Sequence, residues 1–220
     1  MLDYSVIITA GGTGKRMGAP IPKQFMEVAG KPMLFHTISL FHRHNPNAQI
    51  LITLPESWMD HWSELVNTYQ FDVEHEVVVG GKERFHSIQN ALHQCQESIV
   101  LVHDGVRPLV SNETLNRCLV ALEGHNAVVP VVPVKESLRR IKDRGTEAVF
   151  RSEYRNVQTP QCFEKATLEK AYAQSYHDGI TDDASLVEQL GEAIFCVEGN
   201  DENIKVTTPM DLVLAEALLK

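Results

Sequence analysis

The sequence predicts an α/β fold in which a mostly parallel sheet is flanked by helices, and two observations carry this prediction. Short runs rich in β-branched residues recur along the 220-residue chain, and segments with apolar residues at helical spacing lie between them. Near-continuous apolar strands joined by helices are typical of a parallel sheet that is covered on both faces. Because such folds bind ligands at the carboxyl ends of the strands, a site is expected in the loops that follow them.

Six runs are expected to form the strands, at residues 5–9, 49–54, 76–79, 98–103, 127–134 and 193–197. Helices are expected where apolar residues recur every three or four positions, as at Leu34 and Ile38. Ser111 has the position of a helix N-cap, and Thr208 followed by Pro209 has the pattern of another helix start.

The composition, with 43% hydrophobic and 22% charged residues, is that of an ordinary globular protein, and a single domain over residues 1–220 is expected. Lys and Arg number 20 and Asp and Glu number 29, which gives a formal net charge of -9. Since an acidic chain repels the phosphate backbone, nucleic acid is not an expected partner. Any anion that binds must be held by a local cluster of Lys, Arg and backbone N–H groups.

The four cysteines are far apart and form no CxxC pair, so neither a zinc site nor a redox dithiol is predicted. They are expected to be buried thiols of a reducing compartment. No stretch approaches the roughly eighteen apolar residues of a membrane span, so a cytosolic protein without a membrane partner is expected.

Residues 135–155 depart from the α/β pattern, because charged residues alternate there with apolar ones such as Ile141 and Phe150 around Asp143-Arg144-Gly145. This pattern predicts a β-hairpin arm. A hairpin cannot bury its apolar side alone, so the arm is expected either to pack on another subunit or to form a surface excursion of the same chain.

The first predicted strand runs into a glycine-rich segment, Ala10-Gly11-Gly12-Thr13-Gly14. Glycines remove side chains that would keep an anion away from the backbone N–H groups. The segment matches neither the P-loop nor the dinucleotide fingerprint. Arg16 and Lys23 follow it in the sequence and add positive charge beside it. It is interpreted as a nucleotide loop, and the alternative is a tight turn with solvated basic residues.

Asp104 follows another predicted strand, in His103-Asp104-Gly105-Val106-Arg107-Pro108. A carboxylate at the end of a buried parallel strand is well placed to hold Mg²⁺, which prefers carboxylate, water and phosphate oxygens. The alternative is an Asp that caps the loop and pairs with Arg107. His103 is assigned no chemistry.

A third loop, Gly80-Gly81-Lys82-Glu83-Arg84-Phe85-His86-Ser87, lies between a predicted strand and a predicted helix. Its two glycines and Ser87 could contact a base edge through the main chain and a hydroxyl. A simple helix-entry turn is the alternative interpretation.

Together with further motifs in the same order and approximate spacing, these loops resemble those of the 2-C-methyl-D-erythritol 4-phosphate cytidylyltransferases of the non-mevalonate isoprenoid pathway. The similarity covers nearly the whole chain, through AGGTGKRMG, PKQF, GGKERFHS, HDGVRP, PVKESLRR, NVQTPQCF, TDDAS and ENIKVTTPMDL. It implies a nucleotidyltransferase with a Rossmann-like sheet that transfers CMP from CTP to a polyol phosphate and releases pyrophosphate. It also implies a homodimer in which each arm reaches the neighbour's site.

The resemblance also implies roles for individual residues. Arg16, Lys23 and Lys205 are the expected catalytic cations, and Asp104 is the expected Mg²⁺ ligand. The CTP phosphates would be held by Ala10, Gly11, Gly12, Thr13 and Gly14, and the cytosine would be read by Gly80, Gly81 and Ser87. The acceptor-side or phosphate-side positions are Arg107, Thr159 and Thr181, and the arm would offer Ser137 and Arg151 to the acceptor bound by the other subunit.

Two departures from the family pattern fall where the acceptor is chosen. The usual Asp-Thr pair on the arm is Glu136-Ser137 here, and the usual Ala-Ala pair after Asp104 is Gly105-Val106. The related ribitol 5-phosphate cytidylyltransferases often carry Val at the position of Val106, so ribitol phosphate is the alternative acceptor. The TDDAS motif favours the isoprenoid branch.

The expected reaction needs no general base, because a phosphate monoester has its second pKa near 6 and is mostly ionised at neutral pH. Catalysis then reduces to positioning and to stabilisation of charge by Mg²⁺ and fixed cations. A non-catalytic CTP-binding module and a dimer scaffold are the rival classes. Both are disfavoured because the sequence keeps two cations and a candidate metal carboxylate, whereas a sensor needs affinity for the triphosphate but no stabilisation of the α-phosphorus.

Overall fold

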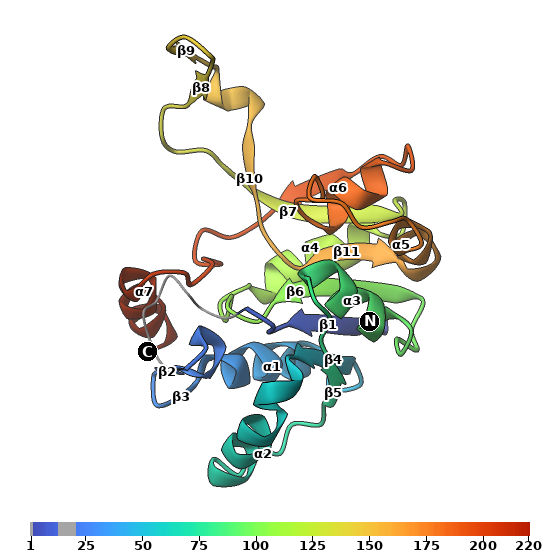
Figure 1. Cartoon of the computed structure of the whole chain (residues 1–220), viewed down its shortest axis with the longest axis vertical. Coiled ribbons are helices and arrows are strands. Elements are labelled where there is room, and N and C mark those ends of the chain that lie inside the picture. The colour runs from blue at the N-terminus through green and yellow to red at the C-terminus, as the bar shows by residue number, and fades with distance from the viewer. Residues whose placement is uncertain (1, 13–20) are drawn as a thin grey trace.

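The computed structural model describes residues 2–12 and 21–220, which form one eight-stranded sheet with helices around it (Figure 1). The strand order is β10-β7-β11-β6-β1-β4-β5, and β12 pairs with β7 beside this path. The strands are β1 (Ser5–Thr9), β4 (Gln49–Leu54), β5 (Glu76–Val79), β6 (Ile99–Asp104), β7 (Ala127–Pro133), β10 (Arg155–Val157), β11 (Gln161–Glu164) and β12 (Phe195–Glu198).

The central strands run in parallel and end at the same level. β1 pairs in parallel with β4 and with β6, and β4 pairs in parallel with β5. The register places Thr9 opposite Thr53 on one side and opposite Asp104 on the other. The carboxyl ends of β1, β4 and β6 therefore meet at one edge of the sheet, where the glycine loop and Asp104 are found.

Helices cover both faces of the sheet because side chains alternate along each strand. In β1, Val6 and Ile8 join the core on one face and Ile7 joins the core on the other. The first face is covered by α1 (Met33–His44), α2 (Met59–Thr68) and α4 (Asn112–Ala121), and the second by α3 (Arg84–Leu92), α5 (Lys165–Tyr172) and α6 (Asp183–Glu188). These two cores confirm the prediction of a sheet flanked by helices.

Several short elements complete the chain. The two-stranded ladder of β2 (Glu27–Val28) and β3 (Lys31–Pro32) leads into α1. Short 3-10 helices lie at Lys23–Phe25, Glu56–Trp58 and Arg151–Glu153. The last helix, α7 (Pro209–Leu219), packs through Ala215 near β2. The backbone N–H of Val206 donates to the carbonyl oxygen of Val106 at 3.0 Å, so the segment before α7 lies beside the loop that follows β6.

All six predicted strands are present. The sheet also contains β10 and β11, which were not predicted from the sequence. β11 lies between β6 and β7 and is antiparallel to both. Its sequence is short and begins and ends with polar residues, so it lacks the apolar run of a buried strand. Gln161 is nevertheless buried, because its side chain donates to Asp182 at 2.7 Å and accepts from the N–H of Ala184 at 2.9 Å.

The predicted hairpin in residues 135–155 is present as β8 (Arg139–Ile141) and β9 (Thr146–Ala148), paired antiparallel. Gly145 in its turn has a φ of 82°, a conformation that favours glycine. The hairpin extends away from the sheet (Figure 1). Ile141 and Phe150 are each 77% exposed, so the described part of this chain does not cover the apolar side of the arm.

Both predicted helix starts are confirmed. The Ser111 hydroxyl accepts from the N–H of Thr114 at the start of α4, and Thr208 and Asp211 form a capping box at the start of α7. Among the residues that the structure describes, no helix has the length and apolar character needed to cross a bilayer. A cytosolic location stays a prediction.

The four cysteines are free thiols, but not all of them are buried. Cys95, Cys118 and Cys162 lie in the core, as predicted. The prediction is wrong for Cys196, which is exposed on β12 because this strand leaves most of its side chains in solvent.

Candidate active site

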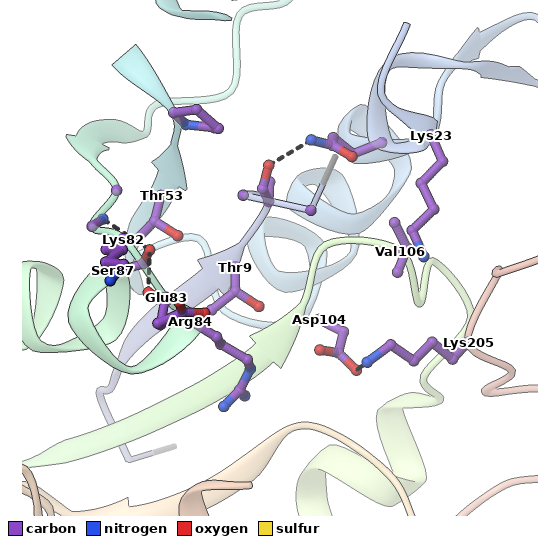
Figure 2. A pocket seen from close by; sticks show the side chains of 17 residues that line it. Thr9, Lys23, Thr53, Lys82, Glu83, Arg84, Ser87, Asp104, Val106 and Lys205 are labelled. Carbon is purple, nitrogen blue, oxygen red and sulfur yellow. Dashed lines mark hydrogen bonds and ion pairs between the residues drawn. The ribbon is translucent and has the colours of Figure 1, made fainter. Parts of the chain in front are cut away.

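A cavity of about 410 Å³ lies at the carboxyl ends of β1, β4 and β6 (Figure 2). Segments far apart in the sequence form its walls, from the glycine loop after β1 to Lys205 before α7. It brings together nine of the predicted site residues: Ala10, Gly11, Gly12, Lys23, Gly80, Gly81, Ser87, Asp104 and Lys205. The predicted site residues Thr13, Gly14 and Arg16 lie outside the described residues.

Main-chain donors in the glycine loop are divided between the fold and the cavity. The N–H of Ala10 donates to the carbonyl of Thr53 at 3.1 Å, and the carbonyl of Ala10 accepts from Gln24 Nε2 at 2.5 Å. Within the described part of the chain, the N–H groups of Gly11 and Gly12 make no hydrogen bond. These two N–H groups, and not that of Ala10, are available to an anion.

Basic side chains outnumber acidic ones around the cavity. Lys23, Lys82, Arg84 and Lys205 line it, together with the two carboxylates Glu83 and Asp104. Figure 2 shows Lys23 extending to Val106 and Lys205 extending from a separate segment to Asp104. A chain with a net charge of -9 thus has a local excess of positive side chains at one cavity, which suits a ligand with several negative charges.

Asp104 ends β6, and its carboxylate receives two cations. Lys205 Nζ lies 3.0 Å and Arg107 Nε lies 3.1 Å from the same oxygen, Oδ2. Burial alone would raise the pKa of Asp104, but the nearby charges of Lys205, Arg84 and Arg107 outweigh it and hold the pKa well below its usual range. The carboxylate is therefore ionised at neutral pH.

His103 and Thr159 stabilise the end of β6 through buried hydrogen bonds. His103 is fully buried; its Nε2 donates to the Arg107 carbonyl at 2.9 Å, and its Nδ1 accepts from the Thr159 hydroxyl at 3.1 Å. The same hydroxyl accepts from the N–H of Asp104 at 3.1 Å. Burial lowers the pKa of His103 to about 4, so the ring is neutral at pH 7. A ring with both nitrogens engaged in the fold has no proton to exchange with a substrate.

The loop after β5 is a tight turn closed by Ser87. The N–H of Gly81 donates to Ser87 Oγ at 3.0 Å, and the Ser87 hydroxyl donates to the Glu83 carbonyl at 3.1 Å. A Cβ at Gly81 would lie 2.3 Å from the Cβ of His86, so no larger residue fits there without a shift of the backbone. The glycine and the serine have a structural role here, and the reading of cytosine by this loop stays a prediction.

Arg84, the first residue of α3, joins the cavity to α6. Its Nη1 and Nη2 contact Asp183 Oδ1 and Oδ2 at 2.8 and 2.6 Å, and the hydroxyl of Tyr172 donates to Oδ1 at 2.5 Å. The Asp183 side chain is fully buried. Burial alone would lower the pKa of Arg84, but the carboxylate of Asp183 outweighs it and raises that pKa. The cation at this wall is thus permanent.

The acceptor-side residues of the prediction do not line this cavity. Arg107 and Thr159 lie behind Asp104, where Arg107 also donates to the carbonyl of Asn203 at 2.8 Å. Thr181 lines a smaller pocket of about 130 Å³ on the other side of Arg84. On the arm, Arg151 lines a separate hollow of about 470 Å³, and Ser137 is exposed. The structure therefore groups the predicted nucleotide residues but not the predicted acceptor residues.

Eight residues of the described cavity lining were not predicted as site residues: Thr9, Gln24, Thr53, Pro55, Lys82, Glu83, Arg84 and Val106. Lys82 lies in the loop after β5, and Arg84 is the first residue of α3; both stand in the glycine motif of residues 80–87. Gln24 stands in the PKQF segment directly after Lys23. Thr53 gives no signal beyond a hydroxyl in an apolar strand, and its Oγ1 is buried without a hydrogen-bond partner in the described structure.

Known proteins are similar in sequence to this chain over nearly its whole length. The IspD family model, described as 2-C-methyl-D-erythritol 4-phosphate cytidylyltransferase, matches residues 4–220. A relative of that name from Bacteroides thetaiotaomicron is 50% identical over 219 residues, which cover 99% of this chain and 100% of the relative.

Solved structures give the same result. The crystal structure of 4-diphosphocytidyl-2C-methyl-D-erythritol synthase from Anaerococcus prevotii superposes with a TM-score of 0.84 at 29% identity, over 99% of this chain and 98% of that one. The 2-C-methyl-D-erythritol 4-phosphate cytidylyltransferase from Thermus thermophilus gives a TM-score of 0.78 at 33% identity, with the same coverage. The family model, the sequence identity to relatives and the shared fold together show that this chain belongs to the 2-C-methyl-D-erythritol 4-phosphate cytidylyltransferase family.

Proposed function

We propose that the cavity binds CTP and transfers CMP to 2-C-methyl-D-erythritol 4-phosphate, with release of pyrophosphate, in isoprenoid precursor biosynthesis. The single observation that carries this assignment to the site is the meeting of Lys23, Lys205 and the open N–H groups of Gly11 and Gly12 at one cavity. The cavity thus combines backbone donors and cations, the two kinds of group that bind a triphosphate.

In the proposed reaction, an ionised phosphate oxygen of the acceptor attacks the α-phosphorus of CTP. The bond from that phosphorus to the bridging oxygen of pyrophosphate breaks, and pyrophosphate leaves with the electron pair. No proton has to be removed from the nucleophile, which is ionised at neutral pH because its second pKa is near 6. A neutral and fully engaged His103 is consistent with this, since the site needs charge stabilisation and not a base.

Asp104 is the proposed ligand of Mg²⁺. Among the described residues no cluster of three or more His, Cys, Asp or Glu side chains could hold a metal by itself. Mg²⁺ commonly binds through one or two carboxylates and completes its shell with water and substrate phosphates, so a single ionised aspartate fits it. Both cations contact Oδ2, and the other oxygen is turned away from Lys205 in Figure 2. Bound there, Mg²⁺ would offset negative charge on the phosphate oxygens.

A homodimer is the second part of the proposal. It is supported by the two apolar side chains that the arm exposes and by the cross-subunit roles that the resemblance implies for Ser137 and Arg151. If each site uses Lys23 from one chain and Arg151 from the other, a mixture of Lys23→Ala and Arg151→Ala chains forms mixed dimers with one intact site. Such a mixture should recover about a quarter of wild-type activity. An activity no higher than that of either variant alone would contradict the shared site.

The deciding experiment measures pyrophosphate release from CTP with 2-C-methyl-D-erythritol 4-phosphate and with ribitol 5-phosphate side by side, with Mg²⁺ and with EDTA. We expect the larger kcat/KM with the methylerythritol phosphate and no turnover in EDTA. A larger value with ribitol phosphate would change the acceptor. Binding of CTP without pyrophosphate release from either acceptor would indicate a sensor.

A further inference from the structure

We infer that Gln24 is a positioning residue that aims the N–H of Gly11 at the phosphates of the nucleotide. This inference rests on the proposed function, because it concerns the phosphate-binding part of the same site. Gln24 lines the cavity, yet it is only 1% exposed, and its Nε2 donates to the carbonyl oxygen of Ala10 at 2.5 Å. A buried side-chain amide that donates a hydrogen bond to a carbonyl oxygen fixes the orientation of that carbonyl.

The geometry of the peptide bond carries this effect to Gly11. The carbonyl of Ala10 and the N–H of Gly11 belong to one planar peptide unit, and in the trans form they point in opposite directions. On the other side of Ala10, its own N–H is held by the carbonyl of Thr53 at 3.1 Å. With both polar groups of Ala10 engaged, the N–H of Gly11 is directed away from Gln24, and it makes no hydrogen bond within the described residues.

The N–H of Gly11 needs the restraint from Gln24 because glycines at positions 11 and 12 give this part of the backbone unusual conformational freedom. Among the described residues, a Cβ at Gly12 would meet no atom within 4 Å, and at Gly11 the nearest atom is Ser87 Oγ at 4.0 Å, so no described neighbour would crowd a side chain at either position. Glycines populate backbone conformations that other residues avoid. If the peptide between Ala10 and Gly11 turned over, a carbonyl oxygen would replace an N–H donor at the site and would repel an anion.

Gln24 also couples the loop to the cation beside it. Lys23 and Gln24 are successive residues of the 3-10 helix Lys23–Phe25. Phe25 anchors this helix, since it is 2% exposed and its ring lies 5.6 Å from that of Trp58 and 6.1 Å from that of Trp62. One rigid turn therefore holds the proposed catalytic cation and the amide that sets the anion-binding main chain, so the two are placed together.

The test uses the Gln24→Met variant, which keeps the length of the side chain and removes the donor. Inorganic pyrophosphate and cytidine are titrated separately into the wild type and the variant by calorimetry. We expect the affinity for pyrophosphate to fall by about tenfold, the effect of roughly one hydrogen bond to a charged group, and the affinity for cytidine to stay unchanged. A general loss of packing would weaken both ligands.

Gln89→Met is the matched control. The Gln89 side chain donates to the carbonyl of Tyr172 at 2.9 Å, so the same change removes the same kind of bond at a place that does not line the cavity. We expect wild-type affinity for pyrophosphate in this variant. An equal loss in Gln89→Met would overturn the positioning role.

A measurement on the wild type keeps the inference falsifiable if Gln24→Met fails to fold. In a ¹⁵N-labelled protein, pyrophosphate should shift the amide resonances of Gly11 and Gly12 more than that of Ala10, whose N–H is already bonded. The reverse order would contradict the inference. If the wild type binds pyrophosphate and Gln24→Met binds it equally, only the role of Gln24 is lost. If the wild type binds neither CTP nor pyrophosphate, the proposed function falls as well.

Discussion

Lys205 Nζ lies 3.0 Å from Asp104 Oδ2, and this contact joins the C-terminal segment of the chain to the end of a central strand. Arg107 Nε contacts the same oxygen at 3.1 Å. The aspartate therefore orients two cations while it remains ionised.

Replacement of Lys23 by Ala should lower turnover and leave CTP affinity nearly unchanged. Its charge is expected to act on the α-phosphorus in the transition state, and loss of one such contact commonly costs on the order of a hundredfold in rate, roughly 3 kcal/mol. Steady-state pyrophosphate release gives kcat, and equilibrium titration gives the affinity for CTP. Lys170→Ala, on α5 and away from the cavity, is the control. Unchanged kcat in Lys23→Ala would remove this lysine from the mechanism.

Arg84→Met should destabilise the protein strongly. The substitution leaves the fully buried carboxylate of Asp183 without its cation, but the Arg84 side chain is itself 37% exposed, so a loss of about 2 kcal/mol is expected. Urea unfolding measures the loss. Arg140→Met breaks the exposed pair with Glu147 on the arm and should cost at most about 1 kcal/mol. Similar losses in the two variants would mean that burial does not set the strength of the Arg84 pair.

Gly81→Ala should destabilise the loop after β5 by about 1–3 kcal/mol, because the new Cβ overlaps the Cβ of His86 and forces the backbone to move. The turn closed by Ser87 would shift with it, so the KM for CTP is expected to rise. Thermal unfolding and initial rates give the two effects. Gly124→Ala adds a methyl group where no atom of the described residues lies within 4 Å, and both quantities should stay close to wild type.

The free energy of unfolding should fall as the pH is lowered from about 6.5 to about 4. His103 has a folded-state pKa of about 4 because it is buried, whereas an unfolded histidine takes up its proton near pH 6.5. The unfolded state therefore binds more protons in this interval, and acid favours it. Burial also lowers the pKa values of His36 and His75, which adds to the same trend. Equal denaturant midpoints at pH 6.5 and 4.5 would contradict this account.

The central parallel strands β1, β4 and β6 could be predicted from the sequence because they are buried on both faces and read as apolar runs. The antiparallel strand β11 could not, since its buried Gln161 is compensated by contacts with Asp182 and Ala184 that come together only in the fold. A sequence pattern records apolar burial, but it does not record the partner that makes a buried amide acceptable.

The site shows the same division. Asp104 and the glycines stand out in the sequence because they directly follow predicted strands, and Lys23 stands out because it follows the first glycine loop. Arg84 and Gln24 do not, because each acts through a contact with a distant residue, Asp183 in one case and Ala10 in the other. The hydrogen bond from the Ala10 N–H to the Thr53 carbonyl, which makes this donor unavailable to a ligand, is likewise set by the register between β1 and β4.

Every strand of the sheet ends before Lys205, so the sheet does not need the segment that supplies this cation to the cavity. A stop codon placed shortly ahead of Lys205 would then yield a protein that retains its β-sheet but cannot complete the transfer.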